Sequence, residues 1–397
     1  MNNTIKLAVA SALLAAASSA SAAGGIVAGD WTLDIGGVVN AYYTSTKVSG
    51  DSTNSTGTST ASNITTGLLP NYLAVSGKTR QNDLDVAFTI SINPGASTQN
   101  SGVQSANQEN RQAFLTFGDA SWGSMKLGKD LGIYASDAIL NDMTLLGVGH
   151  AAGSLAGNTT TLGSIGAGYM YADWKSQVAY TSPNFNGFQF TAGVTQAFDV
   201  DTAGTATASV GGAARGGKEP AYEGKVSYSF AADAVTGKVW ASGISQNLEE
   251  YNVTGKAWDL GATVSAAGFG LTGYYGEGEG TGMTVQFAGA VDDDGVKQDS
   301  KDWYLQATYT LPTVGTKLGA RYGESELDQN SVTSADTAGK AKREMWAAGI
   351  YHPITKHLNL VAEYVEAKNT NTYLATDSSD ATSGKAKTVS LGAILFF

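Results

Sequence analysis

The chain contains no cysteine, only six prolines and only three histidines among its 397 residues. The absence of cysteine excludes a disulfide framework, a thiolate metal site and a lipid-bearing N-terminal cysteine. Charged residues make up 15% of the chain and the net charge is −11. Typical soluble domains contain roughly 25% charged residues. An acidic chain whose Lys and Arg residues are scattered is a poor ligand for nucleic acid. We expect no metal site and no cofactor.

The first 22 residues read as a secretory signal peptide. Lys6 supplies a short basic region, residues 7–17 are apolar, and residues 20–22 are the small residues Ala-Ser-Ala of a cleavage site. We therefore expect an exported mature chain, residues 23–397, that forms one domain. No run of 18 apolar residues follows residue 22, which excludes a transmembrane helix.

Apolar and polar residues alternate along the mature chain with a period of two, which is typical of half-exposed strands. In residues 222–230, for example, Tyr222, Val226 and Tyr228 share one face, and Glu223 and Lys225 share the other. None of the apolar faces carries a charge. A lipid-facing surface has this property, because Lys or Arg facing lipid at mid-membrane costs about 2–4 kcal/mol. Similar alternation occupies residues 86–92, 188–194, 258–264, 303–311 and 358–364.

Long polar stretches and short turns alternate between these segments and together join about 16 strands. The long stretches lie near 45–69, 93–109, 130–170, 197–220, 247–257, 277–301, 325–343 and 367–386. The short turns lie near 78–82, 119–122, 182–186, 231–236, 267–269, 312–316 and 353–356. An even number of strands with short periplasmic turns and long external loops indicates an up-and-down barrel in an outer membrane. The fold class is therefore all-β, a transmembrane antiparallel β-barrel.

Aromatic residues gather near the ends of the predicted strands. Trp258, Trp303 and Trp346 lie where long loops re-enter strands, and Trp31 and Trp122 lie near the other rim. Two girdles of this kind mark the headgroup levels of a membrane, although the core of a soluble β-domain would also bury aromatic rings. The last strand, residues 388–397, has an apolar face that would aggregate as a free edge. In a closed barrel it pairs with the first strand.

The polar faces of the strands assign a set of ionisable residues to the barrel interior. Such residues within membrane-spanning segments line water or pair with each other. The stretch 130–170, which begins at Asp130, is the loop long enough to fold inside and narrow the lumen. Lys126, Lys175 and Arg321 have a simpler alternative, which is structural pairing with neighbouring acids. The full set is Asp34, Asp85, Lys126, Lys175, Glu223, Lys225, Asp259, Arg321 and Glu363.

Several segments of the chain resemble the Gram-negative general porins. The paired segments 111–118 and 123–129 are similar to the strands before the family's third loop, and residues 131–143 are similar to the start of that loop. Residues 180–188 match a strand–turn–strand segment, and the terminal Phe397 resembles the residue that the outer-membrane assembly machinery reads. The resemblance extends over the whole mature length.

This resemblance implies a water-filled barrel of about 16 strands that forms a homotrimer in the outer membrane and whose third loop folds inward. It implies that Asp142, and with it Asp137, are acids of the constriction, facing a basic wall that includes Arg111 and Lys129. The chain departs from the family at Leu146, which replaces a second loop acid, and at Tyr72, where an enterobacterial relative has an arginine. The constriction is therefore expected to be less charged and more aromatic.

The expected function is passive diffusion of ions and small hydrophilic solutes, without catalysis. The acidic loops, for example residues 292–294, predict a weak preference for cations, although the same acids would also serve solubility or bridge divalent ions to lipopolysaccharide. One alternative is a substrate-selective channel in which Tyr72, Tyr134 and the tyrosines at 274–275 guide the solute. Another is a non-conducting barrel that acts as an adhesin or surface anchor. The expected partners are membrane lipid, lipopolysaccharide, the assembly machinery and two further copies of the chain.

Overall fold

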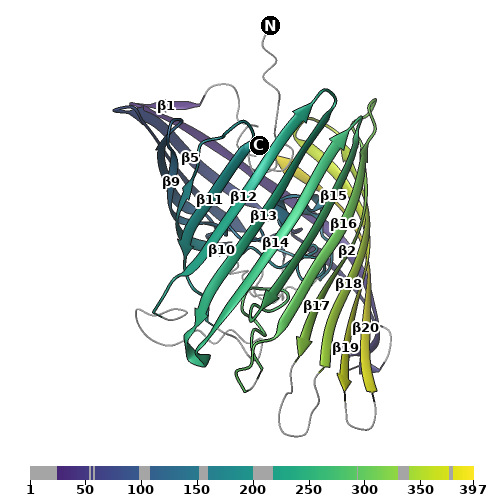
Figure 1. Ribbon diagram of the computed structural model, residues 1–397. Coiled ribbons are helices and arrows are strands. Elements are labelled where there is room, and N and C mark those ends of the chain that lie inside the picture. The colour runs from purple at the N-terminus through teal and green to yellow at the C-terminus, as the bar shows by residue number, and fades with distance from the viewer. Residues whose placement is uncertain are drawn as a thin grey trace.

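The computed structural model describes residues 25–52, 55–56, 59–97, 108–151, 160–199, 218–292, 294–329, 339–374 and 379–397. The predicted signal peptide, residues 1–22, lies outside the described residues. The described part forms one closed antiparallel barrel with a wall of 16 strands (Figure 1), as the sequence predicts. The last strand pairs with the first, with Val39 opposite Leu395 and Tyr43 opposite Leu391, which closes the wall.

Each strand of the wall pairs with its neighbour in the chain. In order, the strands are β2 (Trp31–Ser52), β5 (Tyr72–Gln81), β6 (Leu84–Pro94), β8 (Ala113–Asp119), β9 (Gly123–Leu131), β10 (Trp174–Thr181), β11 (Phe188–Thr195), β12 (Ala221–Ala232), β13 (Val235–Leu248), β14 (Val253–Ala266), β15 (Phe269–Glu279), β16 (Asp299–Thr310), β17 (Lys317–Gln329), β18 (Gly339–Pro353), β19 (Leu358–Leu374) and β20 (Ser379–Phe396).

Four short strands and three short helices complete the described structure. They are β1 (Ile26–Ala28), β3 (Ser55–Thr56), β4 (Ser59–Thr65), β7 (Gln108–Glu109), α2 (Ser136–Leu140), η1 (Met143–Leu146) and η2 (Glu249–Tyr251). β4 pairs with the second half of β2, and β5 pairs with the first half. Residues 66–71 therefore interrupt what is otherwise one strand of the wall. Among the described residues, no helix has the length and apolar character needed to cross a membrane.

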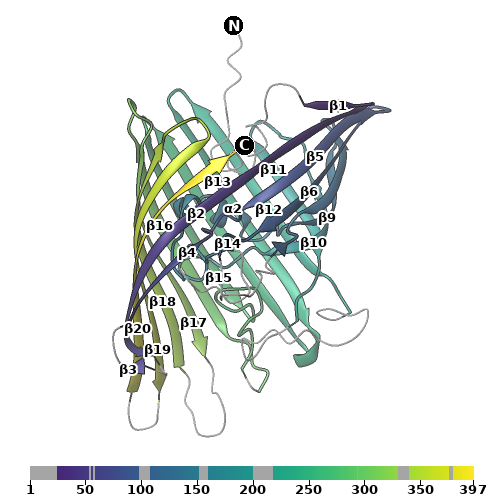
Figure 2. The ribbon, with the colours of Figure 1, turned by 180° about the vertical axis from the view of Figure 1, so that it is seen from behind.

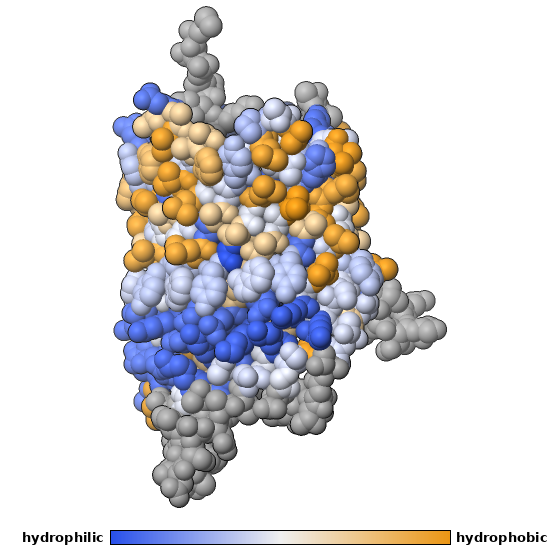
Figure 3. Space-filling model, turned by 90° about the vertical axis from the view of Figure 1, so that its right-hand side faces the viewer, coloured by the Kyte–Doolittle hydropathy of each residue, from blue (hydrophilic) through white to orange (hydrophobic). Residues whose placement is uncertain are grey.

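The two faces of the wall differ in the way that the alternation predicts. Large apolar side chains are exposed on the outside, for example Ile90, Leu260 and Leu305. Their neighbours in the chain point inward and are polar or charged. Figure 3 shows the result on one side of the barrel, where a hydrophobic zone borders a hydrophilic band near the loop-side end. Trp258, Trp303 and Trp346 each contact a tyrosine of the next strand, with ring centroids 5.0–5.8 Å apart.

Several strands continue further into the predicted loops than expected. β2 runs to Ser52 although a loop is predicted from residue 45, and β19 and β20 extend into the loop predicted at 367–386. The strands continue to form backbone hydrogen bonds beyond the part whose outward side chains are apolar. In this extension the outward side chains are Lys and Glu, which pair with each other across neighbouring strands. Their pairs include Lys342 with Glu324 at 2.8 Å and Lys385 with Glu366 at 2.6 Å. We call these outward charges of β14–β20 the outer charged band.

The wall is uneven in height (Figure 2). β5, β6 and β8–β11 have 7–11 residues, whereas β12–β20 have 11–18. At the opposite end from the long loops, tight turns join the strands. Asn82 and Asp83 both have positive φ, 49° and 60°, which is the backbone of a type I′ hairpin and suits the right-handed twist of the flanking strands.

Candidate functional site inside the barrel

A long segment leaves the wall after β9 and returns to it at β10. We call its described residues, 132–151 and 160–173, the inward segment. Its backbone amides donate hydrogen bonds to side chains of distant strands: Met143 to Gln306 of β16, Val148 to Glu363 of β19, and Gly168 to the hydroxyl of Ser325 on β17. These acceptors belong to the inner face of the wall, so the segment lies within the ring of strands, where Figure 2 places α2.

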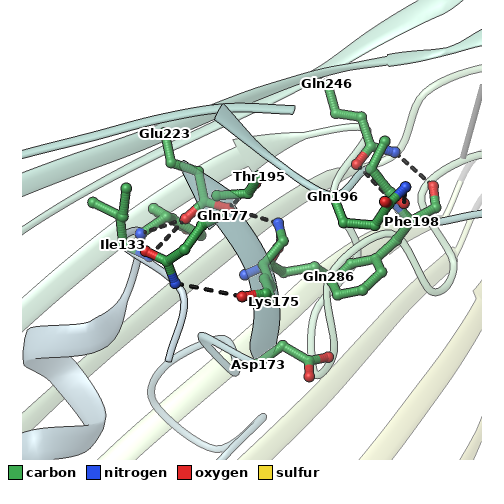
Figure 4. Close-up of polar contacts among 12 residues, drawn as sticks. Ile133, Asp173, Lys175, Gln177, Thr195, Gln196, Phe198, Glu223, Gln246 and Gln286 are labelled. Carbon is green, nitrogen blue, oxygen red and sulfur yellow. Dashed lines mark hydrogen bonds and ion pairs between the residues drawn. The ribbon is translucent and has the colours of Figure 1, made fainter. Parts of the chain in front are cut away.

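The start of the inward segment is held by a buried ion pair (Figure 4). Nζ of Lys175 lies 2.6 Å from Oε1 of Glu223, and both side chains are fully buried. Oε2 of Glu223 accepts hydrogen bonds from the amides of Ile133 and Tyr134, each at 2.8 Å. Thr195 donates a further bond to Oε1 at 2.7 Å. The structure therefore places Lys175 and Glu223 together in a closed network, which matches the alternative of structural pairing.

A second loop also enters the barrel. The described residues 280–292 and 294–298 connect β15 and β16, where the sequence predicts an external loop. The amide of Tyr171 donates to the carbonyl of Thr284 at 2.9 Å. Gln286 accepts from Lys175 and donates to the carbonyls of Tyr171 and Ala172. We call residues 280–292 and 294–298 the supporting loop. Phe287 of this loop is fully buried. A phenylalanine within a largely polar stretch is the sequence signal that part of the loop packs against protein.

Asp137 of α2 faces two lysines of the wall. Lys225 lies 3.0 Å from its Oδ2, and Lys238 bonds its Oδ1. Burial raises the pKa of Asp137, but the two lysines outweigh burial and hold that pKa below its usual range. Asp259 lies nearby on β14 and accepts from the amide and hydroxyl of Ser242 at 2.9 and 2.7 Å. Lys238 was not predicted from the sequence, although it lies two residues before the buried Trp240 on β13 and therefore shares its inward face.

Asp142 begins η1 and is the most enclosed acid of the segment. Its carboxylate accepts from the amide and hydroxyl of Thr144, at 3.0 and 2.7 Å, and from the hydroxyl of Tyr169 at 2.7 Å. Nε of Arg321 lies 3.9 Å away. The guanidinium of Arg321 also lies over the ring of Tyr304, 4.5 Å from its centroid. The structure thus places a predicted loop acid, Asp142, beside a predicted lumen cation, Arg321, with both side chains buried.

Glu363 binds the far end of the inward segment. Its Oε2 accepts from the amides of Val148 and Gly149 at 2.7 and 3.1 Å, and its Oε1 accepts from the hydroxyl of Tyr351 at 2.7 Å. His150 follows directly, with Nε2 2.8 Å from the carbonyl oxygen of Ile165. Burial, and after it the charge of Arg343, lowers the pKa of His150 to about 3, so its imidazole is neutral at physiological pH.

Three of the residues predicted for the basic wall, Arg111, Lys126 and Lys129, lie on or beside β8 and β9. Arg111 donates to Glu109 at 2.7 Å and to the hydroxyl of Thr160 at 3.3 Å. Lys126 bonds Asp130. Lys129 and Tyr72 line the cavity described next. The remaining predicted residues are Asp34 on the inner face of β2, Asp85 paired with Arg80 at 2.8 Å, and Phe397, whose amide and carbonyl bond Gly37 at 3.0 and 2.9 Å.

Three cavities lie inside the barrel along the inward segment. The middle cavity, of about 420 Å³, lies between the segment and the wall and is lined by Tyr72, Arg111, Lys129, Leu140 and Trp174 among others. The inner cavity, of about 380 Å³, lies at the short-turn end and is lined by Asn141, Asp142, Lys317 and several Thr and Ser residues. The outer cavity, of about 360 Å³, lies toward the loop-side ends of β19 and β20 and is lined by His150, Leu162 and Arg343. Sequence reasoning missed Lys317 and Arg343, although each continues the inward register of its strand.

The carboxylates of the described interior take part in ion pairs and hydrogen bonds. Among the described residues, no group of three or more His, Asp or Glu side chains is placed to hold a metal ion. The acids Asp142, Glu223 and Glu363 instead accept hydrogen bonds from lysine, hydroxyl or backbone amide groups. A closed barrel with a narrowed, charge-lined interior defines the class of transmembrane β-barrel channels.

Comparison with protein families gives the specific assignment. The model of the Gram-negative porin family matches residues 8–372. The chain belongs to the Gram-negative porin family, and this confirms the resemblance found in the sequence. Membership places the chain in the outer membrane of a Gram-negative bacterium and implies a channel rather than an enzyme. Comparison with curated proteins gave no match.

Solved structures show the same fold at low sequence identity. The outer membrane channel DcaP of Acinetobacter baumannii is 16% identical with a TM-score of 0.63, over 94% of this chain and 100% of that chain. An anion-selective porin from Comamonas acidovorans is 14% identical with a TM-score of 0.58, over 92% and 100%. OmpF of Salmonella typhi, in complex with daunomycin, is 16% identical with a TM-score of 0.55, over 92% and 99%.

Proposed function

We propose that this chain is a diffusion porin, which lets ions and small hydrophilic solutes cross the outer membrane down their gradients. The observation that carries the proposal is the presence of cavities between the inward segment and the wall of a closed barrel. Sixteen strands enclose more space than side chains alone fill, and here two loops narrow that space. The ionisable residues predicted for the site act in this proposal by holding the inward segment in place and by lining the cavities.

Liposome swelling tests the proposal. Purified, refolded protein is reconstituted into liposomes that contain a large dextran, and the liposomes are diluted into isosmotic glycine. Glycine that enters through the channel draws water, so we expect the turbidity to fall quickly. Substituting an impermeant dextran outside is the control and should abolish swelling. Liposomes that contain folded protein but do not swell in glycine would contradict the proposal and favour the adhesin or anchor.

We also propose a homotrimer that associates through the side of the wall formed by the short strands β5, β6 and β8. The outward side chains of β5, β6 and β8 include Val75, Ile90, Ile92 and Leu115, all exposed and apolar, and no ion pair of the outer charged band lies there among the described residues. Native mass spectrometry of the detergent-solubilised protein should give three times the chain mass, whereas a monomer would contradict this arrangement.

The remaining partners follow from position in the membrane. The outer charged band lies beside the aromatic rings of Trp303 and Trp346, at the level where lipopolysaccharide headgroups would meet the barrel, and we assign it that contact. Phe397 is assigned the role of assembly signal, and residues 1–22 that of export. The acidic loops, from which the sequence predicts a weak preference for cations, would enrich cations only locally at the outer mouth, within about 8 Å of each charge at physiological ionic strength.

A further inference from the structure

The three cavities adjoin one another in a fixed order. Leu162 lines both the outer and the middle cavity, and Leu140 lines both the middle and the inner cavity. The outer cavity is built from the loop-side parts of β2, β19 and β20, and the inner cavity includes the turn residues 266–268. The order outer, middle, inner therefore runs from one end of the barrel to the other, with a leucine at each junction.

Each cavity has a cation in its lining that lacks an acidic partner. Within the described residues, no carboxylate oxygen lies within 4.0 Å of a nitrogen of Arg343, Lys129 or Lys317. Arg343, in the outer cavity, donates instead to Asn369 at 2.9 Å and to Thr284 at 3.3 Å. Lys129 lines the middle cavity. Lys317, in the inner cavity, lies 5.0 Å from the centroid of the Tyr351 ring.

The acids along the same route are already engaged. Glu109 accepts from Arg111 in the middle cavity. Asp142, at the inner cavity, accepts three hydrogen bonds and faces Arg321. Asp173, the other acid of the middle cavity, accepts a hydrogen bond from the amide of Trp174 at 2.6 Å. The described lining of the outer cavity contains no acid. The unpaired charge that a solute meets along the route is therefore positive.

The lining between these cations is largely apolar. Leu69, Ile139, Leu140 and Leu145 face the middle cavity, together with Trp174. Apolar constrictions disfavour the passage of hydrated inorganic ions, because water leaves narrow hydrophobic passages readily. A solute with an apolar body replaces that water at lower cost. The lining thus combines attraction for a negative charge with tolerance for an apolar group.

We propose that the preferred solutes are small carboxylates with an apolar or aromatic body, which pass through the three cavities by way of Arg343, Lys129 and Lys317. This inference rests on the proposed channel function and specifies its substrate class. It assigns the sign of the selectivity to the cations inside the barrel rather than to the acidic loops at the mouth. Leu140 and Leu162 would be the positions that discriminate between an organic anion and chloride.

Single-channel recording with benzoate as the probe tests the charge part of the proposal. For the wild-type protein in a potassium chloride gradient, we expect a reversal potential directed toward chloride and a saturable block of the chloride current by benzoate. Arg343→Gln should weaken the block roughly fivefold, as expected for the loss of one charged hydrogen-bonding partner. Lys317→Gln should act in the same direction, and it keeps the test decisive if the first variant does not fold.

The matched control lies at the neighbouring position on β18. Lys342 carries the same charge as Arg343, but alternation turns it outward, where it pairs with Glu324 at 2.8 Å. Lys342→Gln changes the net charge equally and should leave the block unchanged. Equal effects of Arg343→Gln and Lys342→Gln, or a wild-type reversal potential directed toward potassium, would overturn the proposal.

Leu140→Ala tests the apolar junction. We expect chloride conductance to rise about twofold as the passage becomes wetter, and the preference for benzoate over chloride to fall. Leu260→Ala, at an exposed outward position of β14, is the control and should conduct like the wild type. An unchanged conductance for Leu140→Ala would contradict the claim that solutes pass Leu140 between the middle and inner cavities. If folded wild-type protein carries no current at all, the porin proposal itself fails, which is distinct from failure of the substrate class.

Discussion

Nζ of Lys175 and Oε1 of Glu223 lie 2.6 Å apart with no exposure of either side chain. The pair joins two neighbouring regions of the wall, and Glu223 also binds the first amides of the inward segment. Lys175 in turn binds Gln286 of the supporting loop at 3.0 Å. One ion pair therefore couples the wall to both loops that narrow the barrel.

Glu223→Gln should destabilise the docking of the inward segment. Removing one partner of a buried pair leaves the other charge uncompensated, which costs about 3–5 kcal/mol. Hydrogen exchange of the amides at 133–135 should accelerate strongly. The double variant Glu223→Gln with Lys175→Met removes the stranded charge and should recover part of the loss. A double variant that exchanges faster than Glu223→Gln alone would contradict this account of the pair.

Asp142→Asn should shift the reversal potential toward anions. The substitution removes one negative charge at the inner cavity and leaves Arg321 without its carboxylate partner, so the local potential becomes more positive. The measurement is the reversal potential of single channels in a salt gradient. Asp328→Asn, at an outward, exposed position of β17, is the control. An unchanged potential would remove Asp142 from the conduction path.

Gly147→Ala should loosen the contact between the inward segment and β19. A Cβ atom at this position would overlap with the carboxylate of Glu363, which must then move away from the amides of Val148 and Gly149. Forced shifts of this kind cost about 1–3 kcal/mol. We expect noisier channel currents and faster exchange of both amides. Gly384→Ala is the control, because an added Cβ atom there meets nothing within 4 Å.

Lowering the pH should weaken the docking of the inward segment against β19, because His150 becomes protonated. Its pKa falls from 6.5 to about 3 on burial, so the unfolded segment binds a proton that the docked segment does not bind. The stabilising effect of the docked, neutral form is complete above pH 6.5 and decreases as the pH falls toward 3, by about 1.4 kcal/mol per pH unit at most.

His150→Gln should reduce this pH dependence, because an amide nitrogen can still donate to the carbonyl of Ile165 but does not titrate. The measurement is the exchange protection of residues 160–165 between pH 7 and pH 4, corrected for intrinsic exchange rates. A slope that is identical in the wild type and the variant would contradict the assignment to His150.

The barrel itself could be predicted from the sequence because its wall follows one rule. Alternation places Leu260 outside and Asp259 inside, and the same rule holds from β2 to β20. The pairing of the last strand with the first was also predictable, since the apolar face of residues 388–397 needs a partner strand, but the register of that pairing was not. Strand length was not, because Lys385 and Glu366 extend the strands by pairing beyond the membrane, and hydropathy carries no signal of this.

The interior could be predicted only in part. Alternation identified Glu223, Arg321 and Glu363 as inward, but their partners depend on where residues 132–173 lie in three dimensions. Nothing in the local pattern links Glu363 to the amides of Val148 and Gly149, which lie 215 and 214 positions away. The supporting loop was missed for the same reason, since its acidic residues 292–294 suggested a solvated loop.

The most direct test of the central claim is the single-channel current of purified, refolded protein in a planar bilayer. The account predicts discrete, ohmic steps of conductance that appear as channels insert. Protein whose barrel is intact by circular dichroism and by its heat-modifiable migration, and which nevertheless carries no current, would contradict the assignment of this chain as an open porin.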